Sequence, residues 1–442
     1  MFFLGVFIYF IIRISNITSR SKELICVIEF NRHGARTSKS FSSQTLSKVF
    51  GSNMMLTPNG FRQHEMLGQF MRNKYIFDTK NFLNKDYSQY DFIIFSTPIQ
   101  RTISSAIGYI NGFYPNYITK MLYQNNSELS EIINNDTIPF QNSENFLFNE
   151  IPIHIFSKAN DIFHRKDCFY KGNNLEELLD KDKEIFNFDT MNISNISKEL
   201  GKFLNIDPPE EEGDIENGNY LNDLEKYLQS FLYHYGKSLD DPTLSKEIIK
   251  IIRMKCLQKK YSYRIEDSKY LRMLSSEIFI EILNYFEKII YNPLQYKMIV
   301  YTAHDSNLMN LLSNLLKSET IEDYVNKAVD EQDYFDFLFP PYASTILFEL
   351  YKTNNNEYIV NINYNGKLLN KDLKYITNDK IINGDIKYSD FKFMLENLIT
   401  KDYKKLICNG IPVDKSLEEK FNFVKKEKKD YQEHFLKRIR RK

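Results

Sequence analysis

Two arginines and a histidine occur within five residues of one another, at the end of an apolar run. Arg32, His33 and Arg36 belong to the stretch FNRHGARTS (30–38), which begins where LICVIEF (24–30) ends. Clustered cations repel one another unless an anion lies among them, and the planar guanidinium group matches the oxygens of a phosphate. The stretch is therefore predicted to bind a phosphate-like anion.

The histidine in this cluster has the chemistry of a nucleophile. Repulsion from the neighbouring arginines favours the neutral imidazole of His33, which carries a lone pair on one ring nitrogen. Such a nitrogen can accept a phosphoryl group, and water can then hydrolyse the phosphohistidine. Asp305, in YTAHDSN (301–307), is a candidate to protonate the departing alkoxide. An aspartate there is also a good helix N-cap, so both roles stay open.

Apolar segments predict the strands that must hold these residues. Three of them are apolar on both faces, which is typical of strands inside a parallel sheet: LICVIEF, DFIIFST (91–97) and YKMIVYTA (296–303). A segment with helical features follows each strand, at 61–75, 98–110 and 305–316, and Pro98 is expected at a first helical position. Alternating strands and helices predict an α/β fold, and residues 344–367 alternate as an antiparallel hairpin does.

Six side chains are predicted to meet at one edge of this sheet. Ligands of open parallel sheets bind outside the carboxyl ends of the strands. Every member of the set follows one of the three predicted strands, either directly or at the start of the next helix: Arg32, His33, Arg36, Arg101, His304 and Asp305. Residues far apart in the sequence therefore share one topological position.

These segments resemble the histidine acid phosphatase family, the second branch of the histidine phosphatase superfamily. RHGAR (32–36) and HD (304–305) carry the likeness. Further matches follow in the same order over residues 24–410: LTPNGFRQHEMLGQFMRNKY (56–75), FSTPIQRTISSA (95–106), IPIHIF (151–156), VYTAHDSNL (300–308) and FPPYAS (339–344). The resemblance implies a central, mostly parallel sheet flanked by helices, as in phosphoglycerate mutases, with a smaller helical insertion or cap domain.

The resemblance also implies a role for each member of the set. His33 would be the nucleophile and Asp305 the proton donor, and phosphate would be bound by Arg32, Arg36, Arg101 and His304. The implied activity is hydrolysis of phosphate monoesters at acidic pH. Two alternatives stay open, a phosphoryl mutase of the same fold and a non-catalytic member that binds phosphorylated ligands. No cofactor is expected, and no metal, because the other histidines lack metal-ligand spacing.

The sequence departs from the family pattern on both sides of the reacting residues. Ser38 stands where the family has a proline, and Asn31 stands in place of a bulkier apolar residue. Cysteines give a further point of comparison, because two of the four resemble a conserved bridge of the family. The resemblance therefore predicts a disulfide between Cys168 and Cys408, with the other two cysteines as thiols, Cys26 and Cys256.

The N-terminal residues predict entry into the secretory pathway. FFLGVFIYFII (2–12) fits the apolar region of a signal peptide, placed at residues 1–20, with an uncleaved membrane anchor as the alternative. A cleaved chain would be lysosomal or extracellular and would keep no stable membrane span. N-glycosylation sequons, which are typical of secreted chains, occur at Asn125, Asn135, Asn192 and Asn195.

Changes in composition and charge along the chain suggest a division into domains. The α/β catalytic domain is placed at 21–111 and 291–415, a mostly helical insertion that shapes the substrate pocket at 112–290, and a basic helical tail at 416–442. The tail is read as a solvated surface helix. A net charge of zero and a pI near 7.0 give no reason to expect a nucleic-acid partner. The expected partner is a phosphate monoester, on a small molecule or a phosphoprotein. The oligomeric state is left open, with a homodimer among the alternatives.

Overall fold

The computed structural model describes most of the predicted α/β region. The described residues are 22–37, 54–123, 150–156, 193–204, 249–250, 253–254, 256–257, 269–291 and 296–401. Several sequence-based predictions fall outside them: the signal peptide, the 416–442 tail, Ser38, the Cys168–Cys408 disulfide, and the sequons at Asn125, Asn135 and Asn192. Cys26 and Cys256 are both buried thiols, as expected.

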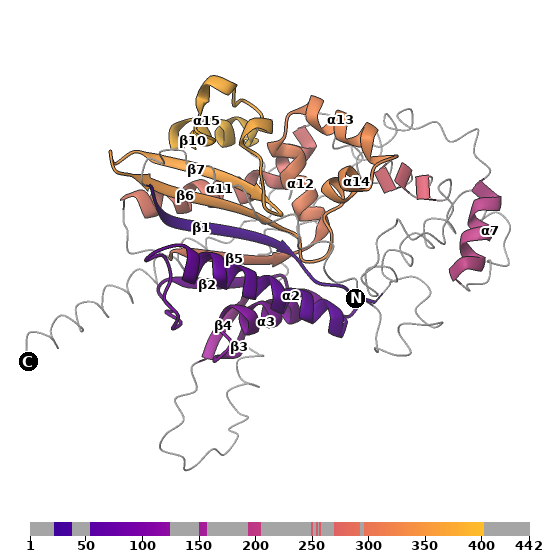
Figure 1. The fold of residues 1–442 in the computed structure, drawn as a ribbon, viewed down its shortest axis with the longest axis horizontal. Coiled ribbons are helices and arrows are strands. Elements are labelled where there is room, and N and C mark those ends of the chain that lie inside the picture. The colour runs from indigo at the N-terminus through magenta and orange to yellow at the C-terminus, as the bar shows by residue number, and fades with distance from the viewer. Residues whose placement is uncertain are drawn as a thin grey trace, which may run out of the picture.

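A ten-stranded sheet forms the centre of the described molecule (Figure 1). Its strands are β1 (Lys22–Arg32), β2 (Phe92–Ser96), β3 (Ile118–Tyr123), β4 (Glu150–Ile155), β5 (Met298–Ala303), β6 (Thr345–Thr353), β7 (Tyr358–Tyr364), β8 (Lys367–Leu368), β9 (Ile381–Ile382) and β10 (Asp385–Lys387). They lie in the order β3-β4-β2-β5-β1-β6-β7-β10-β9, with β8 beside β7. The strands from β3 to β1 in this order are parallel, and those from β6 onward are antiparallel.

The predicted α/β fold is confirmed, and the three predicted strands are its centre. β2, β5 and β1 are adjacent and parallel, so their carboxyl ends meet at one edge. The predicted 344–367 hairpin is β6 and β7. The stretch 112–290, expected to be mostly helical, also supplies β3 and β4 to the sheet. β4 alternates buried and half-buried side chains, which is a strand pattern. The division into domains stays a prediction.

Helices cover both faces of the sheet (Figure 1). One face carries α2 (Pro58–Arg72), the π-helical η2 (Asn73–Asp78) and α3 (Gln100–Phe113). The other carries α11 (Lys269–Tyr291), α12 (Asp305–Leu315), α13 (Ser318–Ala328), α14 (Gln332–Leu338) and α15 (Tyr388–Leu398). The remaining elements are α7 (Ile193–Leu204), which contains the sequon residue Asn195, and the 3₁₀ turns η4 (Asn370–Asp372) and η5 (Asn378–Lys380). Each face buries its own apolar core, and both cores include residues of β1 and β5.

Local sequence explains where two helices beside the carboxyl edge of the parallel strands begin. Thr57 caps α2, because its side chain accepts the N–H of Gly60 at 3.1 Å, and Pro58 occupies the first helical position. The expectation for α3 was wrong by two residues. That helix begins at Gln100, with Ile99 as its N-cap, so Pro98 precedes the helix and does not open it.

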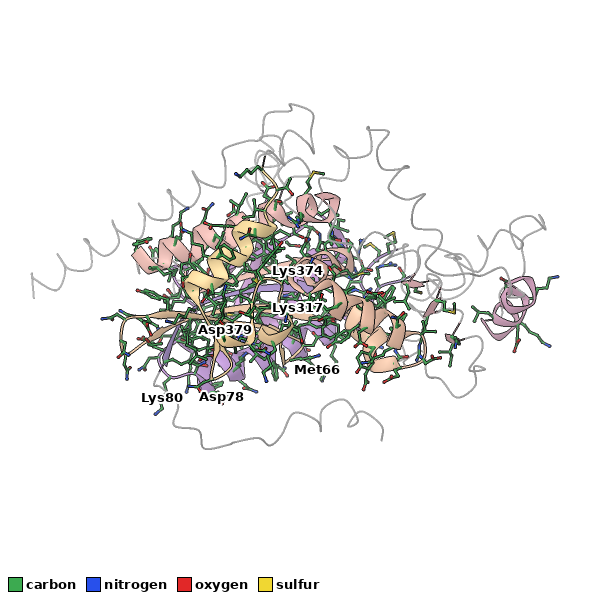
Figure 2. The ribbon with its side chains drawn as sticks, turned by 90° about the horizontal axis from the view of Figure 1, so that it is seen from above. Met66, Asp78, Lys80, Lys317, Lys374 and Asp379 are labelled. Carbon is green, nitrogen blue, oxygen red and sulfur yellow. The ribbon has the colours of Figure 1, made fainter. Side chains whose placement is uncertain are left out.

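α2 is amphipathic, and its buried side meets α3 at the level of the backbone. Met66 marks its exposed side, and Asp78 and Lys80 mark the exposed end of the segment that continues through η2 (Figure 2). On the buried side, a Cβ atom added to Gly68 would lie 2.1 Å from the carbonyl oxygen of Tyr109. One added to Gly112 would lie 1.9 Å from that of Glu65. The contact therefore has no room for a side chain at either glycine.

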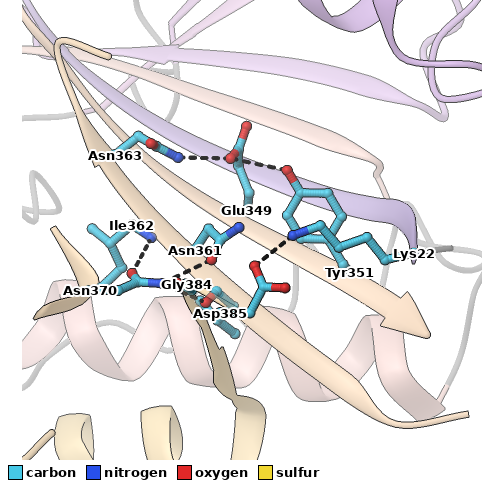
Figure 3. A network of polar contacts seen from close by, with 10 residues as sticks. Lys22, Glu349, Tyr351, Asn361, Ile362, Asn363, Asn370, Gly384 and Asp385 are labelled. Carbon is cyan, nitrogen blue, oxygen red and sulfur yellow. Dashed lines mark hydrogen bonds and ion pairs between the residues drawn. The ribbon is translucent and has the colours of Figure 1, made fainter. Parts of the chain in front are cut away.

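A polar network binds the antiparallel half of the sheet together (Figure 3). The carboxylate of Glu349 in β6 accepts hydrogen bonds from the hydroxyl of Tyr351 at 3.2 Å and from the amide of Asn363 in β7 at 2.8 Å. An ion pair between Lys22 and Asp385 joins the start of β1 to β10. Among the described residues, none of the helices has the length and apolar character needed to cross a membrane.

Candidate active site

The carboxyl ends of β1, β2 and β5 bring all six predicted side chains into one cluster, here called the cage. β1 ends at Arg32, and the backbone N–H of His33 donates to the carbonyl of Ala303 at the end of β5, at 3.0 Å. Arg101 stands in the first turn of α3, just after β2. Because β1, β5 and β2 are adjacent and parallel, residues that follow them in distant parts of the sequence lie close together at this edge, as expected.

His33 presents a lone pair to the cage. Its Nδ1 lies 2.8 Å from the carbonyl oxygen of Gly34. A carbonyl oxygen only accepts, so Nδ1 carries the ring proton and Nε2 is unprotonated. The Nε–H of Arg101 donates to this Nε2 at 3.0 Å, which is consistent with the same tautomer. The unprotonated ring nitrogen of His33 therefore faces a cation.

His304 lies on the far side of Arg101. The Nη2 of Arg101 donates to Nδ1 of His304 at 3.3 Å, and Nε2 of His304 lies 3.1 Å from the hydroxyl of Thr97 at the end of β2. The rings of His33 and His304 are 5.4 Å apart between centroids. Arg101 therefore bridges the two histidines.

Arg32 is held in place from three sides. Its guanidinium group donates to the carbonyl of Pro340 and lies over the ring of Tyr342, 4.0 Å from the ring centroid. Its Nη2 is 4.0 Å from Oδ2 of Asp305. Asp305 itself is partly exposed, whereas Arg32 is buried. The carboxyl group of Asp305 thus lies at the open side of the cage.

Asp305 is a first-turn residue of α12 and is not its N-cap. His304 occupies the N-cap position, and its backbone N–H donates to the side chain of Asn307 at 3.1 Å. Oδ1 of Asp305 accepts the N–H of Ser306 at 2.8 Å. The prediction that Asp305 is the N-cap residue of α12 is therefore wrong. Its other carboxylate oxygen, Oδ2, faces Arg32.

The third arginine of the cage, Arg36, completes the positive surroundings. Its Nη1 donates to the carbonyl of Thr37 at 2.9 Å. The Nε atoms of Arg36 and Arg32 are both buried and have no hydrogen-bond partner among the described residues. Buried donors of this kind are costly unless an acceptor is supplied, and an anion with several oxygens would supply one.

Electrostatics keep the imidazole of His33 neutral. Burial first, and then the charge of Arg101, hold the pKa of His33 well below its usual range, with smaller contributions from His304, Arg32 and Arg36. Burial and the nearby Arg36 lower the pKa of Arg101 to about 10, so this group stays charged near neutral pH. The cage therefore combines a neutral imidazole with guanidinium cations.

Two side chains that sequence reasoning missed hold the loop after β1. The backbone N–H of Gly34 donates to the hydroxyl of Ser105 at 3.0 Å, and that of Ala35 donates to the amide oxygen of Gln63 at 2.8 Å. Gly34 also touches Gly60 of α2 so closely that an added Cβ would lie 2.1 Å from its carbonyl oxygen. The spacing of Ser105, one helical turn after Arg101, was the available signal.

The departure at Asn31 also has a structural explanation. Asn31 is fully buried, and its amide donates to Oε1 of Glu29 at 3.2 Å. Both side chains lie on the same face of β1, which is the α2–α3 face, because residues two apart in a strand point the same way. The polar residue at position 31 therefore belongs to a polar group inside the core.

His64 contacts the backbone of β1 at the end that leads into His33. It is fully buried in α2, and its Nε2–H donates to the carbonyl oxygen of Arg32 at 2.8 Å. Burial lowers the pKa of His64 to about 4. Its ring faces the backbone of β1, and the hydrogen bond to Arg32 gives His64 a structural role.

Acidification should therefore destabilise the protein through His64. The unfolded chain binds a proton near pH 6.5 and the folded chain only near pH 4, so stability is full above pH 6.5 and declines as pH falls to about 4. The shift corresponds to about 3 kcal/mol. His64→Gln keeps an N–H donor and does not titrate. Urea unfolding of both proteins at pH 7 and pH 4.5 should give a smaller loss in the variant, and equal losses would contradict the assignment.

A family model and curated relatives place the chain in one family, and a solved structure has a similar fold. Residues 21–365 match the family model of the histidine phosphatase superfamily (branch 2). The chain is 25% identical to prostatic acid phosphatase of Bos taurus over 356 residues, which are 78% of each chain. It is 32% identical to lysosomal acid phosphatase of Xenopus laevis over 103 residues, 22% of each chain. The solved phytase of Citrobacter braakii has a similar fold, with a TM-score of 0.54, 15% identity and coverage of 86% of this chain and 99% of the phytase.

Proposed function

The chain belongs to the histidine phosphatase superfamily, branch 2, and we propose that it hydrolyses phosphate monoesters through a phosphohistidine at His33. One observation carries the proposal. The unprotonated Nε2 of His33 is aimed into a cluster of three arginines, and the proton on Nδ1 is fixed by the carbonyl of Gly34. A lone pair among cations suits attack on a phosphorus atom whose oxygens those cations hold.

The first half-reaction forms the phosphohistidine. Arg32, Arg36 and Arg101 bind the phosphate oxygens, and phosphorus takes the place of the Arg101 N–H at Nε2 of His33. The N–P bond forms while the P–O bond to the leaving group breaks. The carboxyl group of Asp305 gives its proton to the departing oxygen. Its partly exposed position at the open side of the cage supports that role.

The second half-reaction releases phosphate. The carboxylate left on Asp305 takes a proton from water, and the oxygen of that water attacks phosphorus as the N–P bond breaks. The lone pair returns to Nε2 of His33, and Asp305 is again protonated. His304, beside Arg101 and the nucleophile, is proposed to bind the same phosphate group. Guanidinium groups stabilise the charge on the transferring group in both directions.

The experiment that tests the function uses the purified chain and a panel of phosphate esters, with inorganic phosphate as the measured product. Release of inorganic phosphate supports hydrolysis. Movement of the phosphoryl group within a substrate, without release, would identify a mutase instead. Absence of both reactions would leave only phospho-ligand binding, which would overturn the proposal. The panel also compares small metabolites with phosphopeptides, because the proposed substrate class includes both.

The pH dependence should identify the neutral nucleophile. Because the pKa of His33 is held well below its usual 6.5, protonation should stop the reaction only at lower pH. We expect kcat/KM to persist at pH 5, after correction for the second ionisation of the ester, whose pKa is about 6. An acid limb centred at or above pH 6.5 would contradict this environment for His33.

We propose that the protein enters the secretory pathway. The apolar segment 2–12 fits a signal peptide, and the matched relatives are named prostatic and lysosomal acid phosphatases. Lysosomal and extracellular destinations are both compatible with these names. N-terminal sequencing of the mature chain would test cleavage near residue 20.

A further inference from the structure

One face of α3 runs along the nucleophile strand through three polar contacts. Arg101, Ser105 and Tyr109 are spaced four residues apart, so they lie on one side of the helix. Arg101 donates to Nε2 of His33 at 3.0 Å, and Ser105 accepts the N–H of Gly34 at 3.0 Å. The third contact lies deeper in the core, where the hydroxyl of Tyr109 donates to the carboxylate of an acidic residue in β1.

That acidic residue is Glu29, the exception in an otherwise apolar strand. It is fully buried, and its Oε2 accepts the hydroxyl of Tyr109 at 2.7 Å. Its Oε1 accepts the amide of Asn31 at 3.2 Å and the hydroxyl of Thr345 at 3.1 Å. Burial raises the pKa of Glu29, and these three hydrogen bonds oppose the rise. One carboxyl group thus joins β1, α3 and the start of β6.

These three elements carry most of the catalytic cage. β1 leads into His33, α3 carries Arg101, and the segment just before β6 carries Tyr342, whose ring lies under Arg32. The backbone contacts at Gly68 and Gly112 fix α3 against α2. Apolar contacts are non-directional, whereas a buried hydrogen bond of 2.7 Å fixes both distance and direction.

We propose that the Tyr109–Glu29 hydrogen bond is a positioning contact, which sets α3 along β1 and so sets Arg101 against the nucleophile. Tyr109 touches no reacting atom and acts through the helix that carries Arg101. The inference rests on the proposed function, since it concerns the alignment of the same nucleophile. Misplacing reacting groups by about 1 Å can reduce a rate about a hundred-fold, so a contact of this kind can control activity without controlling the fold.

The chain provides a matched control for this contact. Tyr75 in η2 is also fully buried, and its hydroxyl donates to Oε1 of a second buried carboxylate, that of Glu349 in β6, at 2.8 Å. Burial raises the pKa of both tyrosines well above their usual range. Both are buried bonds from a tyrosine hydroxyl to a carboxylate, and Oε1 of Glu349 also pairs with Lys74 at 2.7 Å. η2 carries no cage residue.

The experiment compares Tyr109→Phe with Tyr75→Phe in the full-length protein. Each variant loses one hydroxyl and keeps its ring, so both should fold and show similar decreases in the midpoint of urea unfolding. Tyr109→Phe should lower kcat/KM for an aryl phosphate by about ten-fold, because Arg101 and His33 lose alignment. Tyr75→Phe should keep kcat/KM within about two-fold of the wild type, since no cage residue is displaced.

The pH profile supplies a readout that a loss of stability would not change. The charged and polar groups that face His33 are Arg101 from α3, His304 at the start of α12, Arg32 and Arg36 of its own segment, and the ring of Tyr342. If Arg101 shifts away, its repulsion weakens and the acid limb of kcat/KM moves to higher pH. That shift is expected in Tyr109→Phe and not in Tyr75→Phe.

The outcomes distinguish a failure of the positioning role from a failure of the proposed function. Equal kcat/KM and equal acid limbs in the two variants would overturn the positioning role and leave the proposed phosphatase function intact. A wild-type protein that releases no phosphate would overturn the proposed function, and the positioning role with it. A ten-fold loss and a shifted acid limb, confined to Tyr109→Phe, would support the proposal.

Discussion

Replacing His33 with alanine should reduce hydrolysis of an aryl phosphate by at least about a thousand-fold, because the variant lacks the atom that accepts the phosphoryl group. Nε2 of His33 carries the lone pair to which Nε–H of Arg101 donates at 3.0 Å. Initial rates of phosphate release measure the effect. The protein should still fold, because His33 lies in the loop after β1 and outside the apolar cores.

A matched histidine and a trapping experiment make this result decisive. His154 in β4 lies beside Phe95, with ring centroids 5.4 Å apart, and belongs to no part of the cage. His154→Ala should keep near wild-type rates. Brief reaction with labelled substrate should leave an acid-labile, alkali-stable phosphate on the wild type and none on His33→Ala. Wild-type rates in His33→Ala would rule out the phosphohistidine mechanism.

The second large effect concerns the proton that the leaving group needs. Asp305→Asn keeps the size of the side chain and the oxygen that accepts the N–H of Ser306, and it removes the acidic proton. Alkyl phosphates, whose alkoxides leave poorly, should lose about a hundred-fold or more in kcat/KM, the usual range for general acid catalysis. Aryl phosphates leave as stable phenolates and should lose far less.

The comparison between the two esters is the measurement. Asp333, in the first turn of α14, is a matched aspartate outside the cage, and Asp333→Asn should affect neither ester. Equal losses of both esters in Asp305→Asn would show that the carboxylate orients Arg32 and does not donate a proton. The distance of 4.0 Å between these two groups makes that a real alternative.

Strand-level features of the fold could be predicted because they are local. Runs of apolar residues marked β1, β2 and β5, and the carboxyl-edge rule then placed the six cage residues together. β3 and β4 were missed because long polar stretches surround them. Pro98 was misplaced because a proline before a helix and one in its first turn have the same local sequence pattern.

The supporting contacts could not be predicted because they depend on register between distant segments. Glu29 looked like an isolated exception, and its partners Tyr109 and Thr345 are 80 and 316 residues away. Asn31 departs from the family pattern, and the structure explains it by the hydrogen bond from its amide to the carboxylate of Glu29. Polar residues within an apolar strand are therefore best read as a sign of buried partners, which only the packed structure identifies.

The backbone contact between α2 and α3 also distinguishes residues that the fold requires from residues that only the proposed activity requires. Cage side chains can change and leave a folded protein without chemistry, whereas even one methyl group at Gly68 or Gly112 would enter the neighbouring backbone. A lineage that lost catalysis should therefore drift at Arg101 and Asp305 and keep these glycines. In a related sequence, glycines at these two positions would then indicate common descent. The cage residues would indicate whether that protein is active. A library built to change specificity should hold the glycines constant and vary residues elsewhere.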